Sequence, residues 1–143
     1  MKALLFGSPL EAEAAFYRAF EEADLESMMA VWADDEDIIC IHPSGPRLCG
    51  AEAIRESWRQ LFRDGPSLRF SLTGRQLVNG ATLAVSSLTE NIQVIGEAGP
   101  RHSVTTTNVY LLTTRGWRML AHHASPAAKV SETPPRDMPT VLH

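Results

Sequence analysis

Apolar residues recur at helical spacing in the first half of the chain and at alternate positions in the second half. Ser8, Pro9 and Glu11 form a helix start, since Ser caps, Pro suits the first helical position and Glu the third. The apolar stripe that follows consists of Ala12, Ala15, Phe16, Ala19, Phe20 and Ala23. We expect Asp24 to cap a second helix, which carries Met28, Val31 and Trp32. A third helix after Gly50 presents Ile54, Trp58, Leu61 and Phe62 on one side.

Strand patterns fill the rest of the chain. A short strand is expected at residues 38–42, where the Pro-Ser-Gly-Pro run at 43–46 stops it. Three longer strands follow at residues 68–78, 82–95 and 102–113, and the first two are joined by an Asn-Gly hairpin signal.

Residues 117–123 alternate and complete the predicted sheet. Strict alternation places Trp117, Met119, Ala121 and His123 on one face, with His122 on the other. Helices come first and antiparallel strands last, which predicts an α+β fold rather than a parallel sheet. A sheet that wraps the helices would leave a pocket at its concave face.

Composition narrows the class of protein. The 143 residues carry a formal net charge of −4 and scattered basic residues, so we expect no nucleic-acid partner. The apolar runs are too short to span a membrane, and the first residues lack a signal-peptide pattern. Cys40 and Cys49 have no metal-ligand spacing and are interpreted as reduced thiols of a cytoplasmic protein.

Three blocks of sequence resemble the SnoaL-like branch of the nuclear transport factor 2 (NTF2-like) superfamily. They are IHPSGPRLCGAEAIRESW at 41–58, LTEN at 88–91 and TTTNVYLLTTRGWRMLAHHASP at 105–126. The resemblance implies a cone in which N-terminal helices pack in the concave face of a curved, mostly antiparallel sheet. It also implies a pocket at the open end and a homodimer packed through the sheets. We expect one domain over residues 1–126 and a Pro-rich tail over 127–143.

Two side chains are candidates for moving a proton. His42 ends the first strand, and its imidazole titrates near neutral pH; the alternative is a histidine bonded to the following turn. Glu90 is a lone carboxylate on a largely apolar strand face, where burial would raise its pKa. The alternative for Glu90 is an ion pair with Arg75 or Arg118.

The strand that contains Asn108 carries candidate ligand contacts. Asn is disfavoured in mid-strand, so the amide is expected to hydrogen-bond a ligand or a neighbouring strand. Thr106 and Tyr110 share its face. If the Trp117 face lines the pocket, His123 is a third catalytic candidate; the opposite assignment places His122 in the site instead.

Trp32 and Trp58, from different helices, are either an aromatic wall for a flat ligand or core residues. We predict no metal and no cofactor, because no short ligand spacing supports a site at His42, Glu90 and His123. The sequence leaves two hypotheses. One is a small-molecule-binding protein that acts as an isomerase, dehydratase or cyclase on an apolar carbonyl compound. The other is a non-catalytic ligand-binding or dimerisation module.

Overall fold

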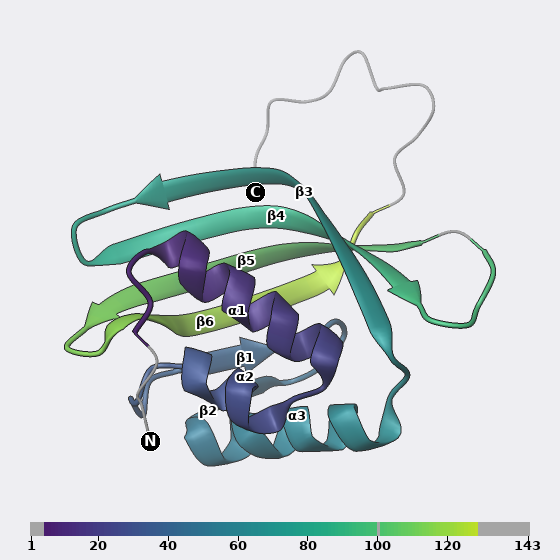
Figure 1. Ribbon diagram of the computed structural model, residues 1–143, viewed down its shortest axis with the longest axis horizontal. Coiled ribbons are helices and arrows are strands. Elements are labelled where there is room, and N and C mark those ends of the chain that lie inside the picture. The colour runs from purple at the N-terminus through teal and green to yellow at the C-terminus, as the bar shows by residue number, and fades with distance from the viewer. Residues whose placement is uncertain (1–4, 100, 129–143) are drawn as a thin grey trace.

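The computed structural model describes residues 5–99 and 101–128 and shows three helices and six strands (Figure 1). The helices are α1 (Pro9–Glu22), α2 (Leu25–Val31) and α3 (Ala51–Asp64). The strands are β1 (Ile39–Ile41), β2 (Arg47–Cys49), β3 (Leu68–Asn79), β4 (Leu83–Val94), β5 (His102–Thr113) and β6 (Gly116–Pro126). Most of the predicted Pro-rich tail, residues 129–143, lies outside the described residues.

Helices α1 and α2 begin at the predicted caps. The Ser8 hydroxyl oxygen accepts a hydrogen bond from the Glu11 backbone N–H at 3.1 Å. Asp24 accepts one from the Ser27 N–H, also at 3.1 Å. Such side-chain oxygens satisfy backbone donors that the first helical turn leaves without partners. The two starts were therefore readable from the sequence alone.

The six strands form one sheet in the order β2-β1-β6-β5-β4-β3. All neighbours are antiparallel except β1 and β6, which run parallel. Strand β2 was not predicted, because its three residues directly follow the Pro-Ser-Gly-Pro run. That run forms a tight turn and lets β2 fold back onto β1, where Cys40 pairs with Leu48.

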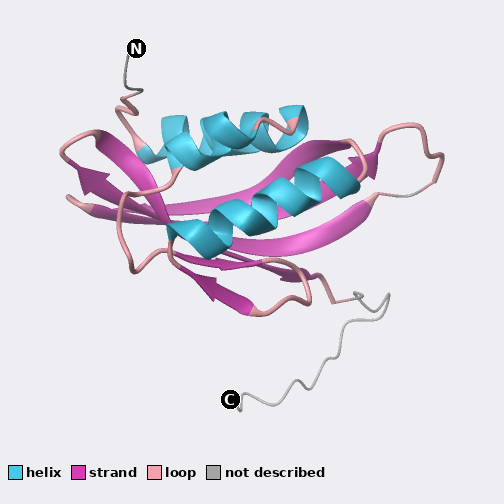
Figure 2. Ribbon diagram, turned by 90° about the horizontal axis from the view of Figure 1, so that it is seen from below, coloured by secondary structure: helices cyan, strands magenta, loops and turns pink. Residues whose placement is uncertain are grey.

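The helices lie together on the concave face of the sheet (Figures 1 and 2). Helix α1 crosses the long strands, while α2 and α3 pack below it in the view of Figure 1. The predicted α+β cone is therefore confirmed. Side chains from both layers fill the space between them, and Phe16, Trp58 and Tyr110 are fully buried there. None of the described helices is both long enough and apolar enough to cross a membrane.

A bulge in β6 changes which of its side chains face the helices. Tyr110 pairs with Met119, but its neighbour Val109 pairs with Ala121, so Leu120 has no partner on β5. The extra residue reverses the alternation beyond it, as bulges do. The prediction that strict alternation runs from Trp117 to His123 is therefore wrong.

The reversal decides between the two adjacent histidines. His122 is 1% exposed and lies on the inner face, beside Asn108 of β5. His123 pairs with Thr107 on the outer face and is exposed. Both assignments that the sequence left open placed Trp117 and His122 on opposite faces, whereas the structure buries both on the inner face and leaves His123 outside.

Candidate functional site

A buried carboxylate on α1 forms the centre of a hydrogen-bond network between helix and sheet. Glu13 is 0% exposed, and each of its oxygens accepts two hydrogen bonds. Oε1 accepts from Ser86 Oγ and Arg75 Nε, both at 2.8 Å. Oε2 accepts from Tyr110 Oη at 2.6 Å and Asn108 Nδ2 at 3.0 Å. Four donors replace the water that this carboxylate loses on burial.

Arg75 reaches Glu13 because β3 contains a bulge. The pairing of β3 with β4 shifts between Thr73 and Gln76, which leaves Gly74 and Arg75 out of register. Gly74 has a φ of 66°, a conformation that favours glycine. The Arg75 side chain remains 37% exposed while its Nε donates to a carboxylate that is almost fully buried. The bulge thus lets a partly exposed arginine at the protein surface bind the buried Glu13 carboxylate.

Asn108 links this network to His122. Its Nδ2 donates to Glu13 Oε2 and to Tyr17 Oη, the latter at 3.1 Å. Its Oδ1 lies 2.7 Å from His122 Nδ1. The predicted hydrogen bond from Asn108 to a neighbouring strand is therefore present, since His122 is the residue paired with it on β6.

Glu90 and Tyr17 form a second acidic pair. Tyr17 Oη donates to Glu90 Oε2 at 2.6 Å, and Glu90 is 2% exposed. Burial raises the pKa of Glu90 to about 6, although the hydrogen bond from Tyr17 opposes the rise. Burial, together with the neighbouring Glu90, also raises the pKa of the Tyr17 phenol. At neutral pH the pair therefore consists of a neutral phenol and a mostly ionised carboxyl group.

His42 lies at the end of β1, half-buried against α3. Its Nε2 is 3.1 Å from Ser57 Oγ and 3.7 Å from Cys40 Sγ. Its ring centroid lies 4.7 Å from that of Trp58 and 6.5 Å from that of His122. Burial lowers the pKa of His42, so the imidazole is neutral at physiological pH.

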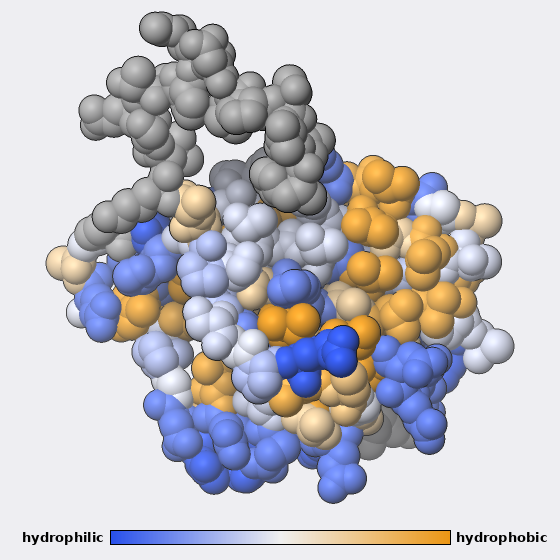
Figure 3. Space-filling model, turned by 180° about the vertical axis from the view of Figure 1, so that it is seen from behind, coloured by the Kyte–Doolittle hydropathy of each residue, from blue (hydrophilic) through white to orange (hydrophobic). Residues whose placement is uncertain are grey.

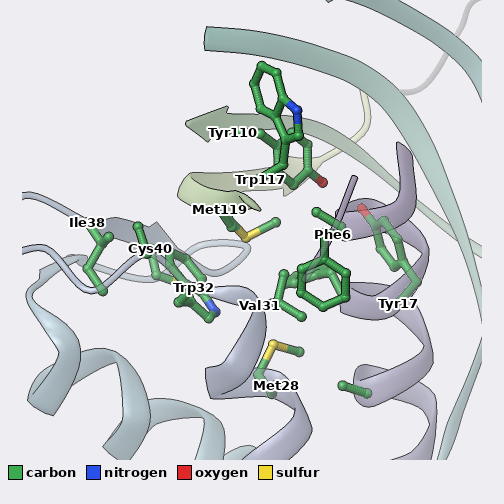
Figure 4. Packing of buried hydrophobic residues seen from close by; sticks show 14 of the residues in the cluster. Phe6, Tyr17, Met28, Val31, Trp32, Ile38, Cys40, Tyr110, Trp117 and Met119 are labelled. Carbon is green, nitrogen blue, oxygen red and sulfur yellow. The ribbon is translucent and has the colours of Figure 1, made fainter. Parts of the chain in front are cut away.

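Trp58 belongs to an aromatic cluster in the cone. Its ring contacts are His42, His122, Phe16, Phe20 and Phe62. Trp32 instead lies at the end of α2, beside Cys40 and Ile38 (Figure 4). Both tryptophans are buried core residues, and both indole N–H groups lack a hydrogen-bond partner among the described residues.

Two cavities are described in the structure, and of the predicted site residues only Trp32 lines one of them. One, of about 790 Å³, is lined by residues that include Trp32, Asp34, Arg55 and Arg115. The other, of about 440 Å³, lies along the outer side of α1. In the cone, the hydroxyl groups of Tyr17 and Tyr110 point toward the same space (Figure 4), where Glu13 and Asn108 join them. These side chains, like those of Glu90 and His122, are buried between the helices and the sheet.

The structure brings together most of the predicted site residues on the inner face. Those at or near the network are His42, Trp58, Glu90, Thr106, Asn108, Tyr110 and His122. His123 and Trp32 lie apart from it. Among residues 5–99 and 101–128, no three His, Cys, Asp or Glu side chains gather as ligands for a metal ion.

Sequence reasoning missed Glu13, Tyr17, Arg75 and Ser86. Glu13 and Tyr17 are four residues apart on a helix, so they share a face with Phe16 and Phe20. A carboxylate and a phenol at this spacing beside two large aromatics were the available signal. The alternative that paired Glu90 with Arg75 is also corrected, because the bulge directs Arg75 to Glu13.

The fold is that of an NTF2-like protein. The SnoaL-like domain matches residues 10–129, and the chain belongs to this family. Among curated proteins, none matches the chain.

Solved structures of similar proteins support the assignment. The chain is 38% identical to a Thiobacillus denitrificans protein described as a candidate calcium/calmodulin-dependent protein kinase type II association domain. That match covers 87% of this chain and 99% of the other, with a TM-score of 0.83. A candidate dehydratase of the NTF2-like family from Streptomyces avermitilis is 30% identical over 82% of this chain and 92% of its own, with a TM-score of 0.76.

An NTF2-like protein of unknown function from Pseudomonas putida shares the fold at 16% identity. The match covers 81% of this chain and 82% of the other, with a TM-score of 0.73. The fold thus persists where little sequence identity remains, so function has to be argued from the site.

Proposed function

We propose that this SnoaL-like protein binds a small, mostly apolar carbonyl compound in its cone and moves a proton on it. The observation that carries the proposal is the buried Glu90–Tyr17 pair. A carboxyl group with a pKa of about 6 holds or releases a proton near neutral pH, which suits general acid–base catalysis. Glu90 also lies on an inner strand face whose neighbours are mostly apolar.

The reaction would be proton removal from the carbon next to the carbonyl group. The Glu90 carboxylate takes that proton, and the electrons of the C–H bond form an enolate. The proton on the Glu90 carboxyl group exchanges with solvent, and Glu90 then returns a proton to the substrate at carbon or oxygen. Tyr17 holds the carboxylate through its 2.6 Å hydrogen bond. His42, neutral and half-buried, is the second group of the cone that can exchange a proton.

Asn108 has the second of the two roles that the sequence left open, a hydrogen bond to a neighbouring strand. Its amide hydrogens bond Glu13 and Tyr17, and its oxygen meets His122. With all three positions occupied, Asn108 orders the site and does not polarise a substrate oxygen directly.

The substrate would enter past aromatic side chains that are only partly buried. Phe70 contacts Tyr17 at 5.4 Å between ring centroids and Phe20 at 4.5 Å. Phe20 also contacts Phe62 at 6.2 Å. These three phenylalanines cover the route to Glu90, and rotation of their side chains would open it.

Hydrogen–deuterium exchange of carbonyl compounds tests this proposal. Cyclohexanone, acetophenone and methyl acetoacetate are incubated with the protein in D₂O, and deuterium uptake next to the carbonyl is measured by mass spectrometry. We expect the wild type to exceed Glu90→Gln by roughly 100-fold for an accepted compound, because general bases contribute on this scale. Glu97→Gln, which alters an exposed carboxylate, is the control and should exchange like the wild type. Equal exchange by wild type and Glu90→Gln overturns the proposal.

One observation favours the second hypothesis, a non-catalytic ligand-binding or dimerisation module. The four hydrogen bonds of Glu13 fix α1 to β3, β4 and β5, which is what a purely structural network would do. Mass spectrometry of a compound recovered after binding separates the two functions. An unchanged compound without deuterium supports the module, whereas deuterium next to the carbonyl supports the enzyme.

We also propose that the protein forms a homodimer through the outer face of its sheet. Val78, Val85, Val109 and Ala121 are paired in register across four strands and form an apolar row on that face. In the space-filling view of this side of the molecule, apolar residues gather in one region (Figure 3). A row of this kind is a surface that a second copy can cover.

A further inference from the structure

The hydrogen bonds of the network determine where His122 carries its proton. The sequence of contacts runs from Glu13 on α1 to Asn108 on β5 and then to His122 on β6. Each contact constrains the next, because a carboxylate accepts only, an amide group has a donor end and an acceptor end, and a neutral imidazole has one of each.

Glu13 fixes the orientation of the Asn108 amide. An ionised carboxylate cannot donate, so the group facing Glu13 Oε2 at 3.0 Å has to be the NH₂ end of Asn108. The oxygen of Tyr17 accepts the other N–H at 3.1 Å, while its own proton goes to Glu90. Both contacts favour the same orientation, and the carbonyl end is left facing His122.

The carbonyl end of Asn108 in turn fixes the tautomer of His122. Oδ1 accepts only, so His122 Nδ1 at 2.7 Å has to be protonated and donating. Complete burial lowers the pKa of His122 to about 3, so the ring is neutral and Nε2 carries no proton. The unprotonated Nε2 lies on the other side of the His122 ring from Nδ1, away from Asn108.

The neighbouring His42 has the opposite tautomer. The Ser57 hydroxyl donates to the Ile54 carbonyl oxygen at 2.7 Å, so it receives its bond from His42 Nε2–H. His42 Nδ1 is then the unprotonated nitrogen. Two neutral imidazoles, 6.5 Å apart between ring centroids, thus each retain one acceptor nitrogen at the same end of the cone.

We propose that Glu13 and Asn108 are positioning residues that hold His122 as the Nδ1–H tautomer, so that its Nε2 accepts a hydrogen bond from a ligand hydroxyl group. The inference rests on the proposed function and narrows its ligand to a hydroxylated carbonyl compound. The carbonyl end of that ligand faces Glu90, and its hydroxyl group faces His122.

Long-range ¹H–¹⁵N NMR of histidine side chains in ¹⁵N-labelled protein tests the tautomer directly. We expect His122 of the wild type to carry its proton on Nδ1, with exposed His123 as the internal comparison. In Glu13→Gln, the new amide group presents an NH₂ end to Asn108, and Asn108 rotates so that its oxygen accepts from it. Asn108 then donates to His122 Nδ1, and the His122 proton moves to Nε2.

Tyr110→Phe is the matched control. It removes one donor to Glu13 and keeps the ring, and three donors still hold the carboxylate. A Glu13 carboxylate that still faces Asn108 leaves the His122 tautomer unchanged. A wild-type His122 protonated on Nε2 overturns the proposal without any variant, and so does an unchanged tautomer in folded Glu13→Gln.

The ligand part is tested with cyclohexanone and 2-hydroxycyclohexanone, whose binding is measured by tryptophan fluorescence. We expect the wild type to prefer the hydroxy ketone by about tenfold, the effect of one hydrogen bond of about 1.4 kcal/mol. Glu13→Gln should lose that preference and Tyr110→Phe should keep it. Equal binding of the two ketones by the wild type overturns the hydroxyl assignment. Absent deuterium exchange combined with a retained preference would reject the proton-transfer function alone.

Discussion

Burial acts in opposite directions on the two kinds of titratable group in the interior. It raises the pKa of Glu90 to about 6 and lowers that of His122 to about 3. Both shifts favour the neutral form, as desolvation requires. Glu13 is better compensated than Glu90, because four donors surround its carboxylate.

Glu90 should make the stability of the protein depend on pH. A carboxyl group whose folded pKa lies above its unfolded value stabilises the fold below the unfolded pKa, and that contribution is lost as pH rises. With values of 4.5 and about 6, the loss falls between about pH 4.5 and pH 6 and amounts to about 2 kcal/mol. We expect Glu90→Gln, which stays neutral, to gain about this much relative to the wild type across that interval.

Urea unfolding at a series of pH values measures this difference. Glu97→Gln at an exposed turn position is the control, and its stability should follow that of the wild type throughout. A constant difference between Glu90→Gln and wild type from pH 4.5 to pH 7 would contradict the raised pKa.

At the scale of elements, two bulges place the polar side chains of the site. The β3 bulge supplies Arg75 to Glu13, and the β6 bulge turns His122 inward. If β6 continued the register of Met119 without a bulge, Ala121 would pair with Asn108, and His123 would face inward in place of His122. The polar network therefore depends on strand irregularities as much as on residue type.

Arg75→Ala tests the contribution of the β3 bulge. We expect a loss of about 2 kcal/mol in the free energy of unfolding, because the buried Glu13 loses a charged hydrogen bond. Denaturant unfolding of Arg75→Ala and Arg69→Ala, the latter an exposed arginine of the same strand, makes the comparison. Similar small losses in both variants would show that Arg75 contributes no more than a surface residue.

The sequence predicted the regular parts of this fold well. Caps at Ser8 and Asp24, the Asn79-Gly80 hairpin and the alternation of β4 and β5 follow from local chemistry. The bulge at Leu120 could not be predicted, because a one-residue change of register leaves no distinctive residue in the sequence. Glu13 was missed because its burial depends on donors from β3, β4 and β5, far away along the chain.

At the scale of the whole molecule, the outer face of the sheet has two chemically different parts. The apolar row of Val78, Val85, Val109 and Ala121 adjoins a polar row of Gln76, Ser87, Thr107 and His123. The proposed dimer would cover the apolar row. The polar row would then lie at the edge of the contact, in the arrangement common at protein interfaces.

Val109→Asp should convert the proposed dimer to monomers, since it places an unpaired charge in the apolar row. Analytical ultracentrifugation at micromolar concentration measures the change. Thr105→Asp, at an exposed position of the same strand, is the control and should remain dimeric. A wild type that sediments only as a monomer at these concentrations would reject the dimer.

The unequal burial of the two cysteines gives the molecule a built-in attachment point. Cys40 is buried, and burial raises the pKa of its thiol to about 12, whereas Cys49 on β2 is exposed. The thiolate is the nucleophile that attacks a thiol reagent, so such a reagent has one accessible target, Cys49. A fluorophore attached there lies opposite Ile39 of β1, the strand that leads to His42. Ligand binding near the histidines could therefore be followed in the unmutated protein, at the single-molecule level.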